Sequence, residues 1–444
     1  MKKAFLILLV LNLFYLNAGC QSAADQKVVS AGVGQDIGTR GPIILKLNQP
    51  GYIDQMTTAI TINPYVELNL IYKEDSLEIR PKTSFQHDQE YMLTLTVRDI
   101  RKESMQENAN FSWSFKTNPA CLLYIAPVTQ FPEIWSYCLD DQIKSQLSHT
   151  DGRVLGFNPS PDGKWIVYSS KNELGGADIW LMDRQGKFTR RLMDCGRDSC
   201  ADVKFAGDEK TIAFIKLAPM TSADNNQRTN ELHIMDIEEQ KTSILRVNEK
   251  IYPLLMDMTN GNKRVTFFDQ RSSSIWIHDL NKKTTIKLPS GEGLGGSWNK
   301  ANDFFTFARM NYWGGIPYGE IYQYDPSSGT IASFLDGRED SYEFFSPQWR
   351  PQDGWLAIAI RPIDGSASKQ IILISKDKEQ RVNVTLDQMY SYGSFSWSSD
   401  GEMIAYQRLR LGDSSALPQV GLWRMQDRSR FILEENAASP QWIP

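Results

Sequence analysis

Residues that could carry out catalysis are few and scattered along this sequence of 444 residues. The four histidines lie far apart and form no cluster with the cysteines or with paired acids: His87, His149, His233 and His278. The sequence has no G-x-S-x-G nucleophile elbow, no Cx2C or HExxH metal motif, no P-loop and no dinucleotide-binding fingerprint. We therefore expect no catalytic residues, no metal site and no cofactor.

Polar residues at turns have a structural interpretation. Asp162, Asp353 and Asp400 each precede glycine, where a carboxylate accepts hydrogen bonds from backbone amides. His233 and His278 occupy positions that aromatic or apolar residues take in comparable segments, so we interpret them as packing residues. The sequence favours a binding protein that is not an enzyme. The alternative is a polysaccharide-active lyase or hydrolase that uses carboxylates which the sequence does not pair.

Aromatic residues beside arginines are the remaining candidates for a binding site. They lie in four long connections, residues 310–319, 336–343, 387–393 and 409–419. Such side chains bind peptides, proteins or sugars through stacking and burial. The alternative is that they only cover the cores of these loops. The candidates are Tyr312, Trp313, Tyr318, Arg338, Tyr342, Tyr390, Tyr392 and Arg410.

These connections belong to a unit that repeats from residue 119 to 444. Each unit has an aromatic residue, a polar turn, a short apolar strand, and then a second strand that carries an aromatic residue and often ends on aspartate. Four short strands every 40 to 53 residues predict a β-propeller, because one four-stranded blade cannot bury both faces alone. Seven units begin near Leu122, Lys164, Lys210, Lys263, Asp303, Gly354 and Glu402.

The two ends of the repeat region predict how the propeller closes. The first unit has no aromatic inner strand before it, whereas the last residues, 439–444 (SPQWIP), match the inner strand at 346–351 (SPQWRP). We expect the C-terminal strand to complete the first of seven blades, which would leave no open sheet edge.

The segments at 160–168 (SPDGKWIVY) and 398–406 (SSDGEMIAY) resemble the WD40-like, PD40-type propeller repeats of the TolB family. The resemblance covers residues 121–444 and implies a propeller in the bacterial envelope. TolB-type propellers commonly have six blades behind a mixed α/β domain. This sequence departs from that pattern, so the resemblance does not transfer TolB's partners.

Residues 42–117 alternate apolar and polar side chains in short runs, such as 59–62 (AITI) and 91–97 (YMLTLTV). This pattern predicts half-buried antiparallel strands in a small sandwich. The runs resemble those of bacterial Ig-like domains, which usually act as spacers or adhesion modules. The expected fold is therefore all-β, an Ig-like β-sandwich followed by a seven-bladed propeller.

The N-terminal sequence predicts the cellular location of the protein. Lys2 and Lys3 precede a short apolar run and small residues before Cys20, which is typical of a lipoprotein signal peptide over residues 1–20. Cys20 would carry the lipid anchor. The alternative is a plain secretory leader, since Asn17 replaces the usual leucine-like residue. Residues 21–41 are small and polar and predict a flexible tether.

The other four cysteines form two candidate disulfides, which suit an oxidising compartment. Cys195 and Cys200 bracket a four-residue loop. Cys121 and Cys138 would lie opposite each other if Ala126 faces Glu133 in a hairpin. Reduced thiols are the alternative.

Charge excludes one class of partner. With 48 basic and 53 acidic residues the net charge is −5, which gives no basic footprint for nucleic acid. We expect a cell-envelope lipoprotein, in the outer membrane or on its periplasmic or surface side, that binds a protein or glycan. A structural part of a larger envelope complex is another possibility.

Overall fold

The computed structural model describes residues 28–30, 37–39, 41–47, 56–72, 76–86, 89–99, 109–206, 208–219, 230–246, 251–255, 258, 264–291, 295–299, 302–351, 354–363, 366 and 368–443. The predicted signal peptide, Cys20, His87 and Asp353 lie outside these residues. Across the described residues the chain is almost entirely β-strand, with one short helix, α1 (Gly337–Asp340). No helix there has the length and apolar character that a membrane crossing requires.

Two four-stranded sheets share one hydrophobic core in the N-terminal part of the chain and form a β-sandwich. Side chains from both sheets, such as Leu45, Leu77 and Leu93, are fully buried in that core. The Ig-like assignment stays a prediction. In spatial order the first sheet has β1 (Val28–Ser30), β3 (Ile43–Leu47), β6 (Ser76–Pro81) and β5 (Leu68–Tyr72), and the second has β2 (Ile37–Gly38), β8 (Ala109–Asn118), β7 (Glu90–Asp99) and β4 (Met56–Asn63).

The sandwich begins earlier than the sequence predicts. Strands β1 and β2 lie within residues 21–41, so the prediction of a flexible tether is wrong at these two places. Strand β1 pairs antiparallel with β3, and β2 pairs parallel with β8. Strands of two or three residues are too short to show alternation, and they gain their hydrogen bonds from a partner that is distant in sequence.

After the sandwich, the described residues form five four-stranded sheets and one eight-stranded sheet. The eight-stranded sheet consists of two units that a single parallel pair, Ala177 with Ser199, joins, so this part of the chain contains seven units of four strands. The first strands of neighbouring units contact each other, as β12 contacts β16 and β24 contacts β28, so they lie innermost. The second unit has β12 (Val154–Pro159), β13 (Trp165–Lys171), β14 (Ala177–Asp183) and β15 (Thr189–Met193), and the third has β16 (Ser199–Phe205), β17 (Thr211–Leu217), β18 (Asn230–Asp236) and β19 (Lys241–Ile244).

The fourth to seventh units follow the same order from inner to outer strand. They comprise β20 (Pro253–Leu255), β21 (Arg264–Asp269), β22 (Ser274–Asp279) and β23 (Thr284–Pro289); β24 (Gly296–Trp298), β25 (Phe305–Trp313), β26 (Ile316–Tyr324) and β27 (Ile331–Leu335); β28 (Tyr342–Trp349), β29 (Trp355–Pro362), β30 (Gln370–Ser375) and β31 (Arg381–Asn383); and β32 (Tyr390–Trp397), β33 (Met403–Arg410), β34 (Gln419–Arg424) and β35 (Arg430–Glu435).

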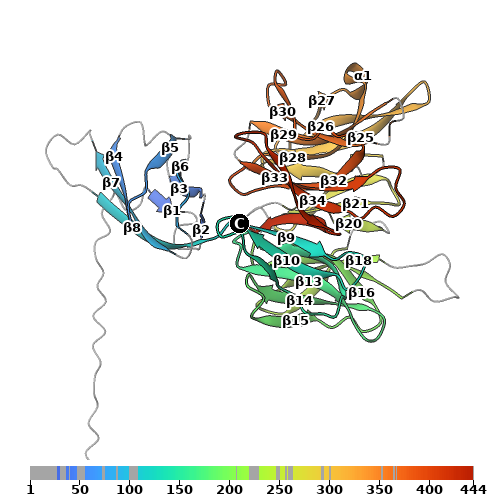
Figure 1. The fold of residues 1–444 in the computed structure, drawn as a ribbon, viewed down its shortest axis with the longest axis horizontal. Helices are drawn as coiled ribbons and strands as arrows, with labels where there is room; N and C mark the ends of the chain where they lie inside the picture. Colours follow the sequence, from blue (N-terminus) through green and yellow to red (C-terminus); the bar gives the residue numbers. More distant parts are fainter. Residues whose placement is uncertain are drawn as a thin grey trace, which may run out of the picture.

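The first unit is assembled from both ends of the repeat region. Its strands β9 (Cys121–Ala126), β10 (Glu133–Cys138) and β11 (Lys144–Gln146) are joined by the last strand, β36 (Ala438–Ile443), which pairs antiparallel with β9. Strand β36 also contacts β32 of the seventh unit and β12 of the second. In Figure 1 the red end of the chain accordingly lies beside the green-blue strands β9 and β10.

Inner-strand tryptophans link one unit to the one before it. The indole N–H of Trp349 donates to Thr306 Oγ1 at 2.7 Å, and that of Trp442 donates to the backbone oxygen of Ser396 at 3.2 Å. Trp298 and Trp397 make the corresponding bonds in their units. A buried indole N–H requires such an acceptor, so these side chains set how neighbouring units pack.

The polar turns after the inner strands are built alike. In the second unit Asp162 Oδ1 accepts from the Ser160 hydroxyl at 2.6 Å and from the backbone N–H of Lys164 at 3.1 Å. In the seventh, Asp400 accepts from Ser398 and from the N–H of Glu402. The interpretation of these aspartates as turn residues is confirmed.

Both predicted disulfides are present. Cys121 and Cys138 lie directly opposite each other in the pairing of β9 with β10, with their Cα atoms 3.9 Å apart. Cys195 and Cys200 are bonded across the connection between the second and third units, with Cα atoms 6.1 Å apart.

The sandwich contacts the propeller beside the first and seventh units. Thr39 Oγ1 donates to Asp140 Oδ2 at 2.9 Å, and Arg80 lies 3.5 Å from the backbone oxygen of Asp400. Asp140 lies in the turn between β10 and β11, and Asp400 in the turn between β32 and β33. The sandwich is therefore placed on the side of the propeller that carries these turns (Figure 1).

Candidate functional site

The opposite side of the propeller, which we name the loop face, carries two kinds of connection. The hairpins between second and third strands emerge there beside the connections from one unit to the next. The N–H of Ala177 donates to the backbone oxygen of Asp198, and the N–H of Tyr392 donates to that of Lys369. Because hairpin and unit-to-unit connection bond to each other, side chains of neighbouring units meet on this face.

The structure divides the predicted aromatic residues into exposed and buried ones. Tyr312 is 64% exposed, whereas Tyr318 and Tyr392 are buried. Tyr342 and Tyr390 are half-buried, and Arg338 and Arg410 are exposed. Trp313 lies in β25, and its side chain is outside the described residues. Because they are buried, Tyr318 and Tyr392 do not offer exposed rings to a ligand, and the alternative of packing applies to these two candidates.

The two buried tyrosines lie in strands, Tyr318 in β26 and Tyr392 in β32, and pack against residues of neighbouring elements. The Tyr392 ring packs edge-on against Tyr406 with ring centroids 5.4 Å apart. The Arg338 guanidinium lies 5.3 Å from the centroid of the Tyr318 ring and forms an ion pair with Asp336 at 2.7 Å. Hydrogen bonding from Arg338 lowers the pKa of the Asp336 carboxyl. Arg338 is thus held by its own loop and is not a free cation.

A groove of about 610 Å³ opens on the loop face between the first and second units, where the sequence predicted no site. One wall is the connection between the two units, residues 148–153, and the other is the hairpin 171–174 with strands β13 to β15. We name it the interblade groove. Its lining includes His149, Asp151, Arg153, Tyr168, Lys171, Asn172, Glu173, Asp178, Trp180, Arg191 and Asp194.

Two aromatic rings line the interblade groove. Tyr168 on β13 lies opposite Trp180 on β14, and the two rings are nearly parallel with centroids 6.5 Å apart. Trp180 is half-buried, whereas Tyr168 is buried. Burial and the nearby charge of Glu133 raise the pKa of the Tyr168 phenol to about 12. Tyr168 therefore stays neutral at physiological pH.

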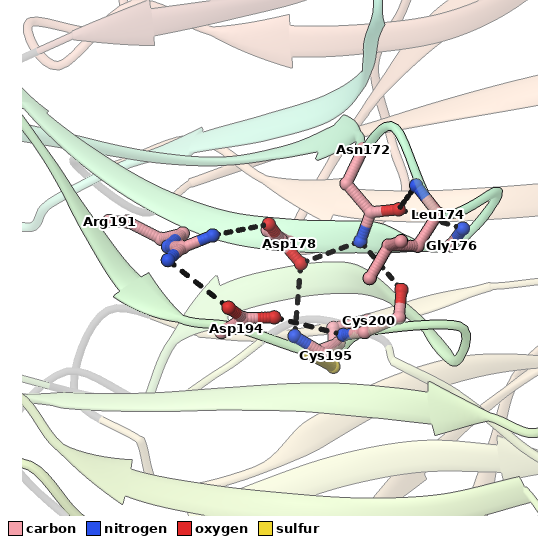
Figure 2. A network of polar contacts seen from close by, with 9 residues as sticks. Asn172, Leu174, Gly176, Asp178, Arg191, Asp194, Cys195 and Cys200 are labelled. Atoms are coloured by element: carbon pink, nitrogen blue, oxygen red, sulfur yellow. Dashed lines mark hydrogen bonds and ion pairs between the residues drawn. A yellow bond between two sulfur atoms is a disulfide. The ribbon is translucent and has the colours of Figure 1, made fainter.

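A buried carboxylate, Asp178, fixes one end of the groove (Figure 2). Asp178 accepts hydrogen bonds from the Asn172 side chain at 2.8 Å and from the backbone N–H of Cys195 at 2.9 Å. Arg191 bridges Asp178 at 3.3 Å and Asp194 at 3.1 Å. Asp178 thus connects hairpin, outer strand and disulfide-bonded loop, and holds the polar residues of the groove in one arrangement.

A second buried carboxylate fixes the other wall. Glu133, at the start of β10, accepts from the backbone N–H groups of Thr150 at 2.6 Å and Gly152 at 3.0 Å, and from the Ser148 hydroxyl. Asp178 stands at the corresponding place near the start of β14. An acid followed by an apolar and an aromatic residue recurs in the sequence at 133–135, 178–180 and 320–322. This recurring acid is a signal in the sequence for carboxylates that accept hydrogen bonds from the connections.

The histidines are placed differently from one another. His233 stacks on Phe214 with ring centroids 5.2 Å apart. Burial lowers the pKa of His278. Both observations agree with a packing role for these two histidines. His149 is exposed on the groove wall, 3.2 Å from the side-chain nitrogen of Gln146. In the described part of the chain, no group of three or more histidine, cysteine or acidic side chains could hold a metal ion.

Comparisons with known proteins support the fold. No family model matches the chain. An uncharacterized protein of Agrobacterium fabrum is 34% identical over 62 residues, which span 14% of this chain and about a fifth, 21%, of that relative.

Solved structures similar to this chain include a prolyl endopeptidase, with a TM-score of 0.50, 11% identity, and coverage of 80% of this chain and 49% of that one. TolB from Acinetobacter baumannii has a TM-score of 0.44 with 14% identity and 81% coverage of both chains. An oligogalacturonate lyase in complex with manganese has a TM-score of 0.48 with 11% identity, over 89% of this chain and 95% of that one. The prediction of a β-propeller is confirmed at the level of the fold.

Proposed function

We propose that this chain is a non-catalytic binding module of the bacterial cell envelope and that its interblade groove binds a glycan. The observation that carries the proposal is the groove itself, in which the half-buried Trp180 stands among polar side chains of both charges. Concave sites with a few placed polar groups are typical of small-ligand and polymer recognition.

The chemistry of the lining favours a sugar. An indole ring offers a flat apolar surface to the C–H face of a pyranose, and Asn172, Arg191 and Asp194 offer donors and acceptors to its hydroxyls. The groove is partly open to solvent, which leaves room for a glycan that extends beyond it. Basic and acidic side chains both line the groove, which suits a hydroxyl-rich ligand better than a strongly charged one.

The envelope address is part of the same proposal and rests on the N-terminal sequence. A lipoprotein leader ending at Cys20 would anchor the chain. The sandwich would then stand between anchor and propeller, since it contacts the side of the propeller away from the loop face. Both disulfides fit an oxidising compartment.

The experiment is a glycan array probed with the full chain, followed by titration of the best glycan. Trp180→Ala is expected to weaken binding at least about tenfold, which equals about 1.4 kcal/mol. Phe188→Ala is the matched control: Phe188 is also an aromatic residue of the second unit, 48% exposed and outside the groove lining.

Three results would overturn parts of the proposal. Equal loss in both variants would mean that the groove is not the site. Binding of peptides and not of glycans would mean that the groove recognises a protein partner. Turnover of a bound glycan would make the chain an enzyme of the polysaccharide-active class.

A further inference from the structure

A second cluster of polar residues lies on the loop face, between the sixth and seventh units and away from the interblade groove. The connection before β30 is bonded to the start of β32. The Ser368 hydroxyl donates to the backbone oxygen of Tyr390 at 2.8 Å, and the N–H of Tyr392 donates to that of Lys369 at 2.9 Å. These bonds hold the ends of the two units together.

Two cations of the sixth unit share one aromatic ring. The Lys369 ammonium lies 4.4 Å from the centroid of the buried Phe345 ring, and the Arg361 guanidinium lies 5.4 Å from it. The two positive charges are therefore within about 10 Å of each other, since both contact the same ring. The seventh unit adds Arg408, whose guanidinium lies 3.9 Å from the centroid of the Tyr390 ring.

The cluster has more positive than negative charge. The buried Glu343 pairs with Arg361 and compensates one cation. Arg408 bonds through Nε to a neutral partner, Gln419 Oε1, at 2.8 Å. Asp387, the nearest acid in the connection before β32, uses its carboxylate for the N–H of Met389 in its own turn. Among the described residues, no ion pair joins Lys369 or Arg408 to a carboxylate.

The surroundings of Lys369 disfavour its positive charge. Burial, and next the repulsion from Arg361, lower the pKa of the Lys369 ammonium, while Glu343 acts in the opposite direction. Glu343 is one counter-charge beside two neighbouring cations, so the excess positive charge leaves a position for an external anion, which would relieve the repulsion.

We infer that Arg361, Lys369 and Arg408 form a second binding site, which takes an oxyanion, a carboxylate or a phosphate, carried by a ligand that reaches the loop face. The geometry suits this chemistry, because guanidinium groups bind such oxyanions through paired N–H donors. Tyr390, half-buried beside Arg408, provides an aromatic surface next to the anion. The site is independent of the interblade groove and of the glycan proposed for it.

The test measures the binding of two probes, inorganic phosphate and D-glucuronate, to the full chain at low ionic strength, with chloride at equal ionic strength as reference. Saturable stabilisation against heat is expected with one probe or both. Phosphate alone would assign a phosphorylated ligand, and glucuronate alone would assign a carboxylated one.

Lys369→Gln and Arg408→Gln are each expected to raise the apparent Kd at least about tenfold, since each removes a charge-assisted contact. Lys369→Gln is expected to fold, because its charge is disfavoured in the native state. Lys369→Arg, which keeps the charge, is expected to retain most of the binding.

Lys376→Gln is the matched control. Lys376 belongs to the same unit and also lies over an aromatic ring, 5.9 Å from the centroid of Phe304, but directly after the other end of β30. Its variant is expected to bind the probe like the wild type. The inference is overturned if neither probe binds saturably, or if Lys376→Gln weakens binding as much as Lys369→Gln.

Discussion

Replacement of Asp178 by alanine tests whether this carboxylate fixes the disulfide-bonded loop and one end of the interblade groove. The backbone N–H of Cys195, in a buried residue, would lose its acceptor, at a cost of about 1–3 kcal/mol. The half-exposed Arg191 would lose one ion-pair partner, worth at most about 1 kcal/mol. The Asn172 side chain keeps its bond to Gly196. The expected loss is therefore about 1–4 kcal/mol.

Thermal unfolding followed by circular dichroism, without reductant, measures this loss. At about 2 °C per kcal/mol for a protein of this size, the midpoint of Asp178→Ala is expected to fall by roughly 2–8 °C. Asp183→Ala is the control, because Asp183 ends the same strand and its carboxylate accepts an exposed bond from the N–H of Lys187. A midpoint for Asp178→Ala within about 1 °C of that control would refute the role assigned to Asp178.

Three further expectations concern stability. Trp442→Ala removes a buried ring and its bond to the preceding unit, so it should lower the unfolding free energy by about 3–5 kcal/mol in a denaturant titration, and an unchanged midpoint would contradict the role given to β36. Replacement of Cys195 and Cys200 by serine should lower the unfolding free energy by about 2 kcal/mol, because the disulfide closes a short loop and restrains the unfolded chain. Equal unfolding midpoints of the wild type with and without reductant would argue against this effect. Tyr168→Phe should match the wild type at neutral pH and lose less stability in alkali. The unfolded phenol ionises near pH 10, whereas the folded pKa is about 12, so the wild type loses stability as pH rises between these values. Unfolding midpoints at about pH 8 and about pH 11 measure the difference, and parallel changes in both proteins would count against the Tyr168 pKa.

Much of the fold was predictable because its unit repeats. The alternation, the polar turns and the aromatic strands recur often enough to predict the units, and the match between 439–444 and 346–351 predicted the position of Trp442. The disulfide between Cys121 and Cys138 followed from hairpin register. Strands β1 and β2 were missed, because short strands depend on distant partners.

The candidate sites were less predictable, because exposure is a property of packing. Tyr312 and Tyr392 look alike in sequence as loop aromatics, yet one is 64% exposed and the other is buried against Tyr406. The difference arises because the connection before β30 covers the start of β32. By residue type Arg338 could bind a ligand, but it forms an ion pair with Asp336 of its own turn.

The sequence by itself determined the all-β class, the repeated unit, the closing match of the last strand and the pairs of cysteines, since these depend on local periodicity and spacing. Only the tertiary structure decided where a ligand can bind. The interblade groove is lined by residues of the first and second units, whose connections Glu133 and Asp178 hold in place. The second site combines Lys369 of the sixth unit with Arg408 of the seventh, where the backbones of the two units are hydrogen-bonded. Distances between units are set by how the blades pack, and no pattern along one strand encodes them.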